Sequence, residues 1–375
     1  MAGIYIHIPF CRRACHYCDF HFSTTMKKRP EMVQALIQEI RMRRNELHGE
    51  TVETIYFGGG TPSVLSDEEL TSIINEVYAN HTVSENPEIT LEANPDDLNE
   101  SRIASFAKSE INRLSIGIQS FYDDDLAIMN RAHDANEAER ALQFAMVHLD
   151  NVTIDLIYGI PGASHEKWKS NIEKALSYGV PHISAYALTV EPKTALDKMI
   201  RTGSVPAPDE SHSREQFEIL AETLTNSGFV HYELSNFGKP GYFSRNNTAY
   251  WQGKKYLGIG PSAHSYDGQS RSWNIANNSI YIQKIKSGEL PSEKEILSTA
   301  DRFNELVMTG LRTMWGISLE KVQSEFGEEF RSHLLQSAER FLNDGFLEIS
   351  EGSIRATSKG KFLTDGISSD LFLVD

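Results

Sequence analysis

Short apolar runs alternate with amphipathic stretches through the first half of the 375-residue sequence. The apolar runs are predicted strands, and they cover residues 4–8, 54–57, 88–92, 113–118, 152–157 and 182–188. Helices are predicted between them, over residues 30–46, 67–78, 100–108, 136–148 and 165–178. Strands and helices that alternate at this spacing form βαβ units around a parallel sheet. The pattern predicts an α/β fold, a partial (β/α)6 barrel, with a doubly wound sheet as the alternative.

The sequence divides into three parts, with a barrel over residues 1–235, a connecting segment over 236–295 and a C-terminal domain over 296–375. The barrel is predicted to end with a helix over 211–226 and a strand over 229–234. The connecting segment is rich in glycine and aromatic residues, and we expect residues 238–273 within it to be loop-like. In the C-terminal domain, helices are predicted over residues 299–313, 319–326 and 329–344. A hairpin is predicted after them, with strands over 346–349 and 353–356, as in a winged-helix-like arrangement.

Charge and hydropathy restrict the possible partners. Acidic residues outnumber basic residues by 52 to 36, for a formal charge of −16, which argues against a nucleic-acid partner. We therefore expect the C-terminal domain to serve packing or closure. No run of about 18 apolar residues occurs, so we expect no membrane span and at most peripheral membrane association. The N-terminal run MAGIYIHIPF lacks the features of a signal peptide, which predicts a cytoplasmic protein.

All three cysteines of the chain lie within eight residues, as Cys11, Cys15 and Cys18, directly after the first predicted strand. An odd, clustered set of thiols does not build a disulfide framework. Three thiolates in one loop favour an iron–sulfur cluster, in which one iron would be left without a protein ligand and could bind substrate. The alternative is a zinc site that closes with a fourth ligand, such as His16.

Polar residues and glycines stand at the ends of the predicted strands. A glycine turn follows the second strand, and single polar side chains follow or end the next three; these residues are Gly58, Gly59, Gly60, Thr61, Glu92, Gln119 and Asp155. Arg131 lies twelve residues after Gln119. Because the carboxyl ends of barrel strands form the rim where ligands bind, we predict that these residues surround one binding site.

The CX3CX2C spacing and the glycine turn together resemble the radical S-adenosylmethionine (SAM) superfamily. The resemblance implies a 4Fe–4S cluster whose open iron binds the amine and carboxylate of SAM, and a one-electron cleavage of SAM. Within that superfamily the segments resemble the coproporphyrinogen III dehydrogenase group. The resemblance implies SAM contacts at Tyr5, Gly59, Gly60, Thr61, Glu92, Gln119, Arg131 and Asp155. It implies that Arg131 pairs with the SAM carboxylate, and that Glu92 and Asp155 hold polar groups such as ribose hydroxyls.

This group has a dehydrogenase branch and a branch of HemW-like heme chaperones. The dehydrogenases carry a fourth cysteine two residues after the third, where this sequence has Phe20. They also carry an N-terminal extension, which we expect to be absent because a strand is predicted almost at the start. We therefore predict a HemW-like protein that binds heme and transfers it to hemoprotein acceptors, served by an electron donor. The alternative is a porphyrinogen-oxidising dehydrogenase, and no catalytic residue is assigned.

One motif departs from the HemW-like pattern. Those proteins carry HNxxYW, implicated in heme binding, and the corresponding run here begins with Asn246 in place of histidine. Asparagine has no imidazole nitrogen and is a poor iron ligand. The candidate heme residues are therefore Asn247, Tyr250, Trp251 and, as the substitute ligand, His264. His7 is a further histidine that could line the pocket.

Overall fold

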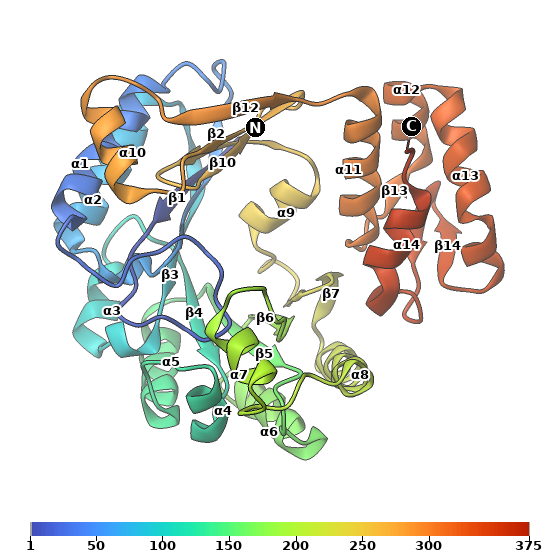
Figure 1. Ribbon diagram of the computed structural model, residues 1–375, viewed down its shortest axis with the longest axis horizontal. Coiled ribbons are helices and arrows are strands. Elements are labelled where there is room, and N and C mark those ends of the chain that lie inside the picture. The colour runs from blue at the N-terminus through green and yellow to red at the C-terminus, as the bar shows by residue number, and fades with distance from the viewer. Residues whose placement is uncertain (1, 375) are drawn as a thin grey trace.

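The computed structural model describes residues 2–374, and its largest element is a 12-stranded sheet. Six parallel strands lie side by side in the order of the chain (Figure 1). They are β1 (Ala2–Ile8), β2 (Val52–Gly59), β3 (Val83–Ala93), β4 (Arg113–Gln119), β5 (Val152–Tyr158) and β6 (His182–Ala187). Sequential order is that of a barrel, whereas a doubly wound sheet reverses direction at its centre. The predicted partial (β/α)6 barrel is therefore confirmed.

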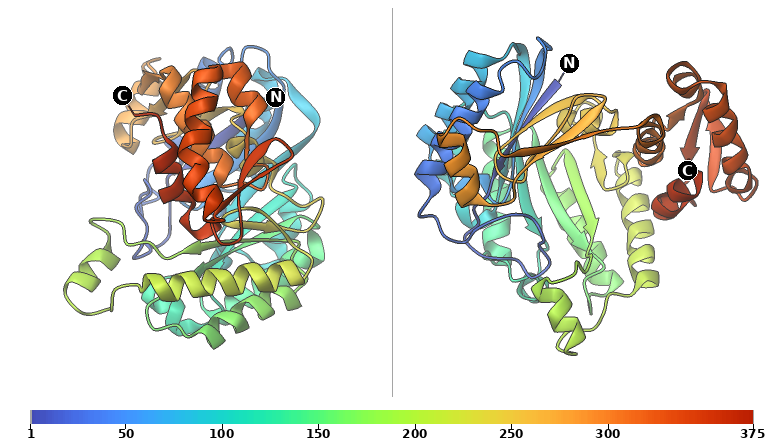
Figure 2. Two further views of the ribbon diagram at one scale, coloured as in Figure 1. Left: turned by 90° about the vertical axis from the view of Figure 1, so that its right-hand side faces the viewer. Right: turned by 45° about the horizontal axis from the view of Figure 1, so that its top comes forward.

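Helices connect these strands and cover the outer side of the curved sheet, as Figures 1 and 2 show. They are α1 (Arg29–Met42), α2 (Asp67–Asn80), α3 (Glu100–Phe106), α4 (Asp123–Ile128), α5 (Ala135–His148) and α6 (His165–Ser177). Helices α7 (Ala195–Arg201) and α8 (Glu210–Asn226) follow β6. Capping boxes begin α2 and α5, where Ser66 and Asp134 each exchange hydrogen bonds with a glutamate three residues later.

The expectation that residues 238–273 of the connecting segment are loop-like is wrong. This segment forms β8 (Asn236–Gly238), α9 (Arg245–Trp251), β9 (Lys255–Ile259), β10 (His264–Tyr266), β11 (Ser270–Asn274), α10 (Asn278–Lys286) and β12 (Ser292–Ile296). Strand β9 pairs in parallel with β1, and β10, β11 and β12 extend the sheet beyond it. At the other edge, β8 and β7 (Val230–Glu233) follow β6. The segment therefore continues the sheet at both edges.

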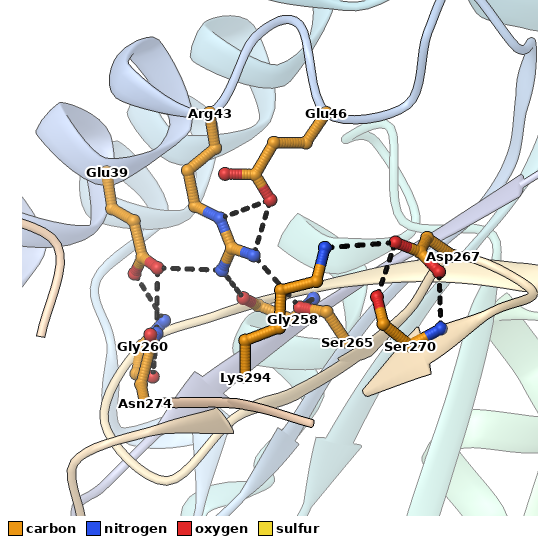
Figure 3. Close-up of polar contacts among 10 residues, drawn as sticks. All are labelled: Glu39, Arg43, Glu46, Gly258, Gly260, Ser265, Asp267, Ser270, Asn274 and Lys294. Atoms are coloured by element: carbon orange, nitrogen blue, oxygen red, sulfur yellow. Dashed lines mark hydrogen bonds and ion pairs between the residues drawn. The ribbon is translucent and has the colours of Figure 1, made fainter. Parts of the chain in front are cut away.

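A buried polar cluster holds this segment to α1 (Figure 3). The Glu39 side chain is fully buried and accepts hydrogen bonds from the Gly260 N–H at 2.7 Å and from Asn274 Nδ2 at 2.7 Å. Arg43 donates to the Gly258 carbonyl at 2.7 Å and pairs with Glu39 at 3.1 Å. The contacts from Glu39 and Arg43 to Gly258, Gly260 and Asn274 each join residues more than 200 apart, so no local pattern in the sequence predicts these strands.

The C-terminal elements form a separate group beside the barrel, with α9 between the two in Figure 1. They are α11 (Thr299–Leu311), β13 (Ile317–Ser318), α12 (Leu319–Phe326), α13 (Glu328–Asn343), β14 (Leu347–Ser350), β15 (Ser353–Ala356) and α14 (Thr364–Leu371). The predicted hairpin is present as antiparallel β14 and β15, which make a three-stranded sheet with β13. This group has its own buried core, which includes Phe303 and Leu334. Within residues 2–374, no helix combines the length and the apolar character that crossing a bilayer requires.

Candidate functional site

The glycine turn after β2 lies directly against the start of the cysteine loop. Parallel pairing sets Ile8 beside Gly59, the Gly60 N–H donates to the Ile8 carbonyl at 2.9 Å, and the Thr61 N–H donates to the Phe10 carbonyl at 2.7 Å. A Cβ atom on Gly60 would lie 2.6 Å from the Phe10 carbonyl oxygen. Only glycine allows this approach, so the turn fixes where the thiol loop leaves the barrel.

Cys11, Cys15 and Cys18 are free thiols that line one cavity of about 570 Å³ at the carboxyl ends of the strands. Burial, assisted by the neighbouring Cys18 and Cys15, raises the pKa of Cys11 to about 11, and a hydrogen bond with Thr61 opposes this rise. Among residues 2–374, no three His, Cys, Asp or Glu side chains are already gathered to hold one metal ion. Three thiolates that line one cavity would need a positive centre, which the irons of a cluster would supply. The thiol cavity therefore fits the cluster that the residues predict.

Arg131 connects the thiols to the strand ends. Its Nη1 donates to Cys15 Sγ at 3.3 Å, and its Nη2 donates to Asn94 Oδ1 at 2.6 Å and to the Gly117 carbonyl at 2.9 Å. The Nε atom is buried and has no hydrogen-bond partner in the structure. A buried guanidinium with an unused donor, facing the thiol cavity, fits an anionic group such as the carboxylate of SAM.

Two partly buried carboxyl groups, those of Glu92 and Asp155, line the same cavity. Burial raises the pKa of Glu92 to about 7, assisted by the negative charge of Asp155, while a 2.7 Å hydrogen bond from the Tyr56 hydroxyl opposes this rise. Burial likewise raises the pKa of Asp155 to about 6, and hydrogen bonds from Ser184 and Ser115 oppose it. Polar groups of a bound ligand would restore the hydrogen bonds that burial removes.

The structure brings most of the predicted residues to this thiol cavity. They are Cys11, Cys15, Cys18, Gly59, Gly60, Thr61, Glu92, Gln119, Arg131 and Asp155. Tyr5 lies elsewhere, because it lines the adjacent cavity on the other side of Glu92. Sequence reasoning missed Asn94, which follows the end of β3 and joins Arg131 to Thr61 by hydrogen bonds. Its position directly after a buried strand is the sequence feature that could have identified Asn94 as a site residue.

A second cavity, of about 800 Å³, adjoins the thiol cavity. All four candidate heme residues line it: Asn247, Tyr250, Trp251 and His264. Both cavities are lined by Asp19, Phe20, Gly59, Glu92 and Tyr186, which form the wall between them. Phe20, at the position where a dehydrogenase would have its fourth cysteine, is 68% exposed and belongs to this shared wall. The volume is within the range of small-molecule and cofactor sites.

Among the described residues, three histidines line the second cavity: His7, His21 and His264. The buried His7 uses both ring nitrogens, at 2.9 Å from the His21 carbonyl and at 3.2 Å from the Tyr5 hydroxyl, and burial lowers its pKa to about 4. His264 is exposed and its ring lies near Trp273, with centroids 6.0 Å apart. His21 places Nε2 at 2.7 Å from Asn278 Oδ1. Sequence reasoning did not single out His21, since nothing near Cys18 marks it as a cavity residue.

Comparison with known proteins agrees with this geometry. The barrel and the thiol cavity define a radical SAM protein, and the Radical SAM superfamily model matches residues 5–175. The HemN C-terminal domain model matches residues 297–363. A solved structure of Escherichia coli coproporphyrinogen III oxidase, HemN, has the same fold, with a TM-score of 0.85 at 22% identity over 99% of this chain and 90% of that one.

Sequence relatives narrow the class further. Heme chaperone HemW of Mycobacterium tuberculosis is 33% identical, over 97% of this chain and 93% of that protein. Heme chaperone HemW of Bacillus subtilis is also 33% identical, over 97% of both chains. The mouse mitochondrial radical S-adenosyl methionine domain-containing protein 1 is 36% identical, over 98% of this chain and 86% of that protein. The chain belongs to the HemW heme-chaperone family.

Proposed function

We propose that this protein is a heme chaperone, which binds a 4Fe–4S cluster and SAM in the thiol cavity and heme in the second cavity. The observation that carries the proposal is the shared wall of Asp19, Phe20, Gly59, Glu92 and Tyr186. It allows two ligands to be held side by side in one molecule. Heme would be passed on to hemoprotein acceptors, and an electron donor would serve the cluster.

The second cavity suits heme in both shape and charge. Aromatic side chains, Tyr250 and Trp251 among them, can pack on the face of a porphyrin. Four cationic side chains also line the cavity: Lys254, Lys255, Arg271 and Arg312. The last three already pair with Glu50, Glu305 and Asp365, so propionates would share these cations or use Lys254. An apolar ring with carboxylates at one edge matches a cavity that combines aromatic walls with cations.

In the thiol cavity, Cys11, Cys15 and Cys18 would hold three irons of the cluster and leave the fourth open. The cluster supplies one-electron chemistry and an iron site for the amino-acid end of SAM. Arg131 would bind the carboxylate of SAM, and Glu92 and Asp155 would bind its polar groups. Gln119, Gly59, Gly60 and Thr61 would complete the walls around it, with Tyr5 behind Glu92. Free thiols fit a reducing compartment, which agrees with a cytoplasmic location.

Anaerobic reconstitution followed by titration tests the proposal. We expect about four irons per chain, heme binding near one per chain, and SAM binding that depends on the cluster. Cys15→Ala should lose iron and SAM, whereas Trp251→Ala should weaken heme binding and retain iron. Stoichiometric zinc without iron, or no heme binding by the wild-type chain, would refute the proposal. Conversion of coproporphyrinogen III with SAM and a reductant would instead establish the dehydrogenase alternative.

A further inference from the structure

The residue at the family histidine position is already engaged in holding the fold. Asn246 Oδ1 accepts a hydrogen bond from Thr54 Oγ1 at 3.0 Å, and its backbone N–H donates to Glu88 Oε1 at 3.1 Å. An amide oxygen held in this way is not a ligand for heme iron, for which imidazole is the usual nitrogen donor. If heme occupies the second cavity, another side chain supplies the iron ligand, and the histidines that line the cavity are the candidates with an imidazole nitrogen.

The three histidines of the cavity differ in what their ring nitrogens do. Both nitrogens of His7 are engaged, and its side chain is only 6% exposed. His264 lines the cavity, yet among residues 2–374 no hydrogen bond to either of its ring nitrogens orients the ring. His21 has one nitrogen engaged, Nε2 with Asn278, so its other nitrogen, Nδ1, is left as an acceptor.

A ring held through one nitrogen is the usual arrangement of a metal-binding histidine. Such residues donate the N–H of one nitrogen to an oxygen acceptor, which fixes the tautomer and directs the lone pair of the other nitrogen at the metal. The Asn278 side chain supplies that acceptor from the start of α10. The rings of His21 and His7 also lie stacked, with centroids 6.2 Å apart and planes 29° apart, which further limits rotation of His21.

We propose that His21 Nδ1 is the iron ligand of heme bound in the second cavity, and that Asn278 is its positioning residue. This inference rests on the proposed function, because it names the ligand within the same heme site. His21 lies three residues after Cys18, in the loop that would hold the cluster. One loop would therefore contact both the cluster and the heme.

Heme titration of four proteins tests this assignment. We expect ferric heme bound to the wild-type chain to give the absorption and EPR signature of imidazole ligation. His21→Ala should lose that signature, bind heme about tenfold or more weakly, and regain the signature when imidazole is added. His264→Ala should keep the wild-type spectrum. His16→Ala is the matched control, because His16 lies in the same loop but does not line the second cavity.

Asn278→Ala provides a milder variant, which should keep heme bound but shift the spectrum and weaken affinity several-fold. An unchanged spectrum in His21→Ala, with circular dichroism and iron content also unchanged, would overturn the assignment and leave the heme-chaperone proposal intact. Loss of the signature in His264→Ala alone would also overturn it, in favour of His264. Absence of heme binding by the wild-type chain would instead overturn the proposed function itself.

Discussion

The guanidinium of Arg131 lies 3.3 Å from the sulfur of Cys15 and so joins the thiol loop to the ends of the barrel strands. The same side chain also holds Asn94 and Gly117. Removing it takes away charge-assisted hydrogen bonds of about 1.5–3 kcal/mol each. Loss of the Arg131 side chain should therefore weaken ligand binding in the thiol cavity.

Arg131→Ala should bind SAM about 10- to 100-fold more weakly in the reconstituted protein, measured by equilibrium dialysis under anaerobic conditions. Arg12→Ala is a suitable control, since Arg12 lies in the thiol loop and its exposed guanidinium pairs with the buried side chain of Asp97. Its SAM affinity should remain close to that of the wild type. Equal affinities of the two variants would show that Arg131 does not hold the ligand.

The raised pKa of Glu92 should make the stability of the ligand-free protein depend on pH. Because burial raises its pKa from the usual 4.5 to about 7, the native state keeps a proton that the unfolded state releases. The contribution of Glu92 to the free energy of unfolding should be greatest below pH 4.5. It should fall by about 3 kcal/mol as the pH rises to 7. Urea unfolding at pH 5 and 7.5 measures most of this fall. Glu92→Gln should reduce the fall to the part that comes from the raised pKa of Asp155. An identical fall in both proteins would contradict the prediction.

Gly59 and Gly162 form a matched pair for testing the turn. Both have positive φ, +101° and +85°, but a Cβ on Gly59 would lie 2.4 Å from His7 Nδ1, whereas a Cβ on Gly162 meets open space. Both alanine variants carry backbone strain of about 1–2 kcal/mol. Gly59→Ala should lose at least about 2 kcal/mol more, because it also overpacks the wall of the cavity. Thermal unfolding of the two variants measures these losses of stability. Equal losses would show that the ring of His7 moves aside in Gly59→Ala.

Much of the barrel follows from the sequence because each strand and helix carries its own periodic pattern. Residues 236–295 do not follow, because their strands are short, polar and held by α1. The cluster cysteines are marked by their spacing, and Glu92, Gln119 and Asp155 by their places at strand ends. The role of His21 and the wall between the cavities could not be predicted from the sequence, because residues that are distant in the sequence line the second cavity together.

The buried contacts of Glu39 hold residues 236–295 to α1, and a substitution of Glu39 tests their contribution to stability. Glu39→Ala removes a fully buried carboxylate from Arg43 and from the backbone of Gly260, which should cost about 3–5 kcal/mol of stability in urea unfolding. Glu31→Ala is the control on the same helix, where an exposed carboxylate pairs with Lys286. We expect the control to change stability little. Similar losses in both variants would mean that the buried cluster does not hold the segment.

The wall between the two cavities has a thermodynamic consequence. Asp19 and Phe20 follow Cys18 directly, so a ligand that orders the thiol loop also orders one side of the second cavity. Any gain in heme affinity that the cluster brings must be matched by an equal gain in cluster affinity when heme is bound. Loss of the cluster would then weaken the hold on heme. Release of the cargo would thus depend on the state of the metal centre.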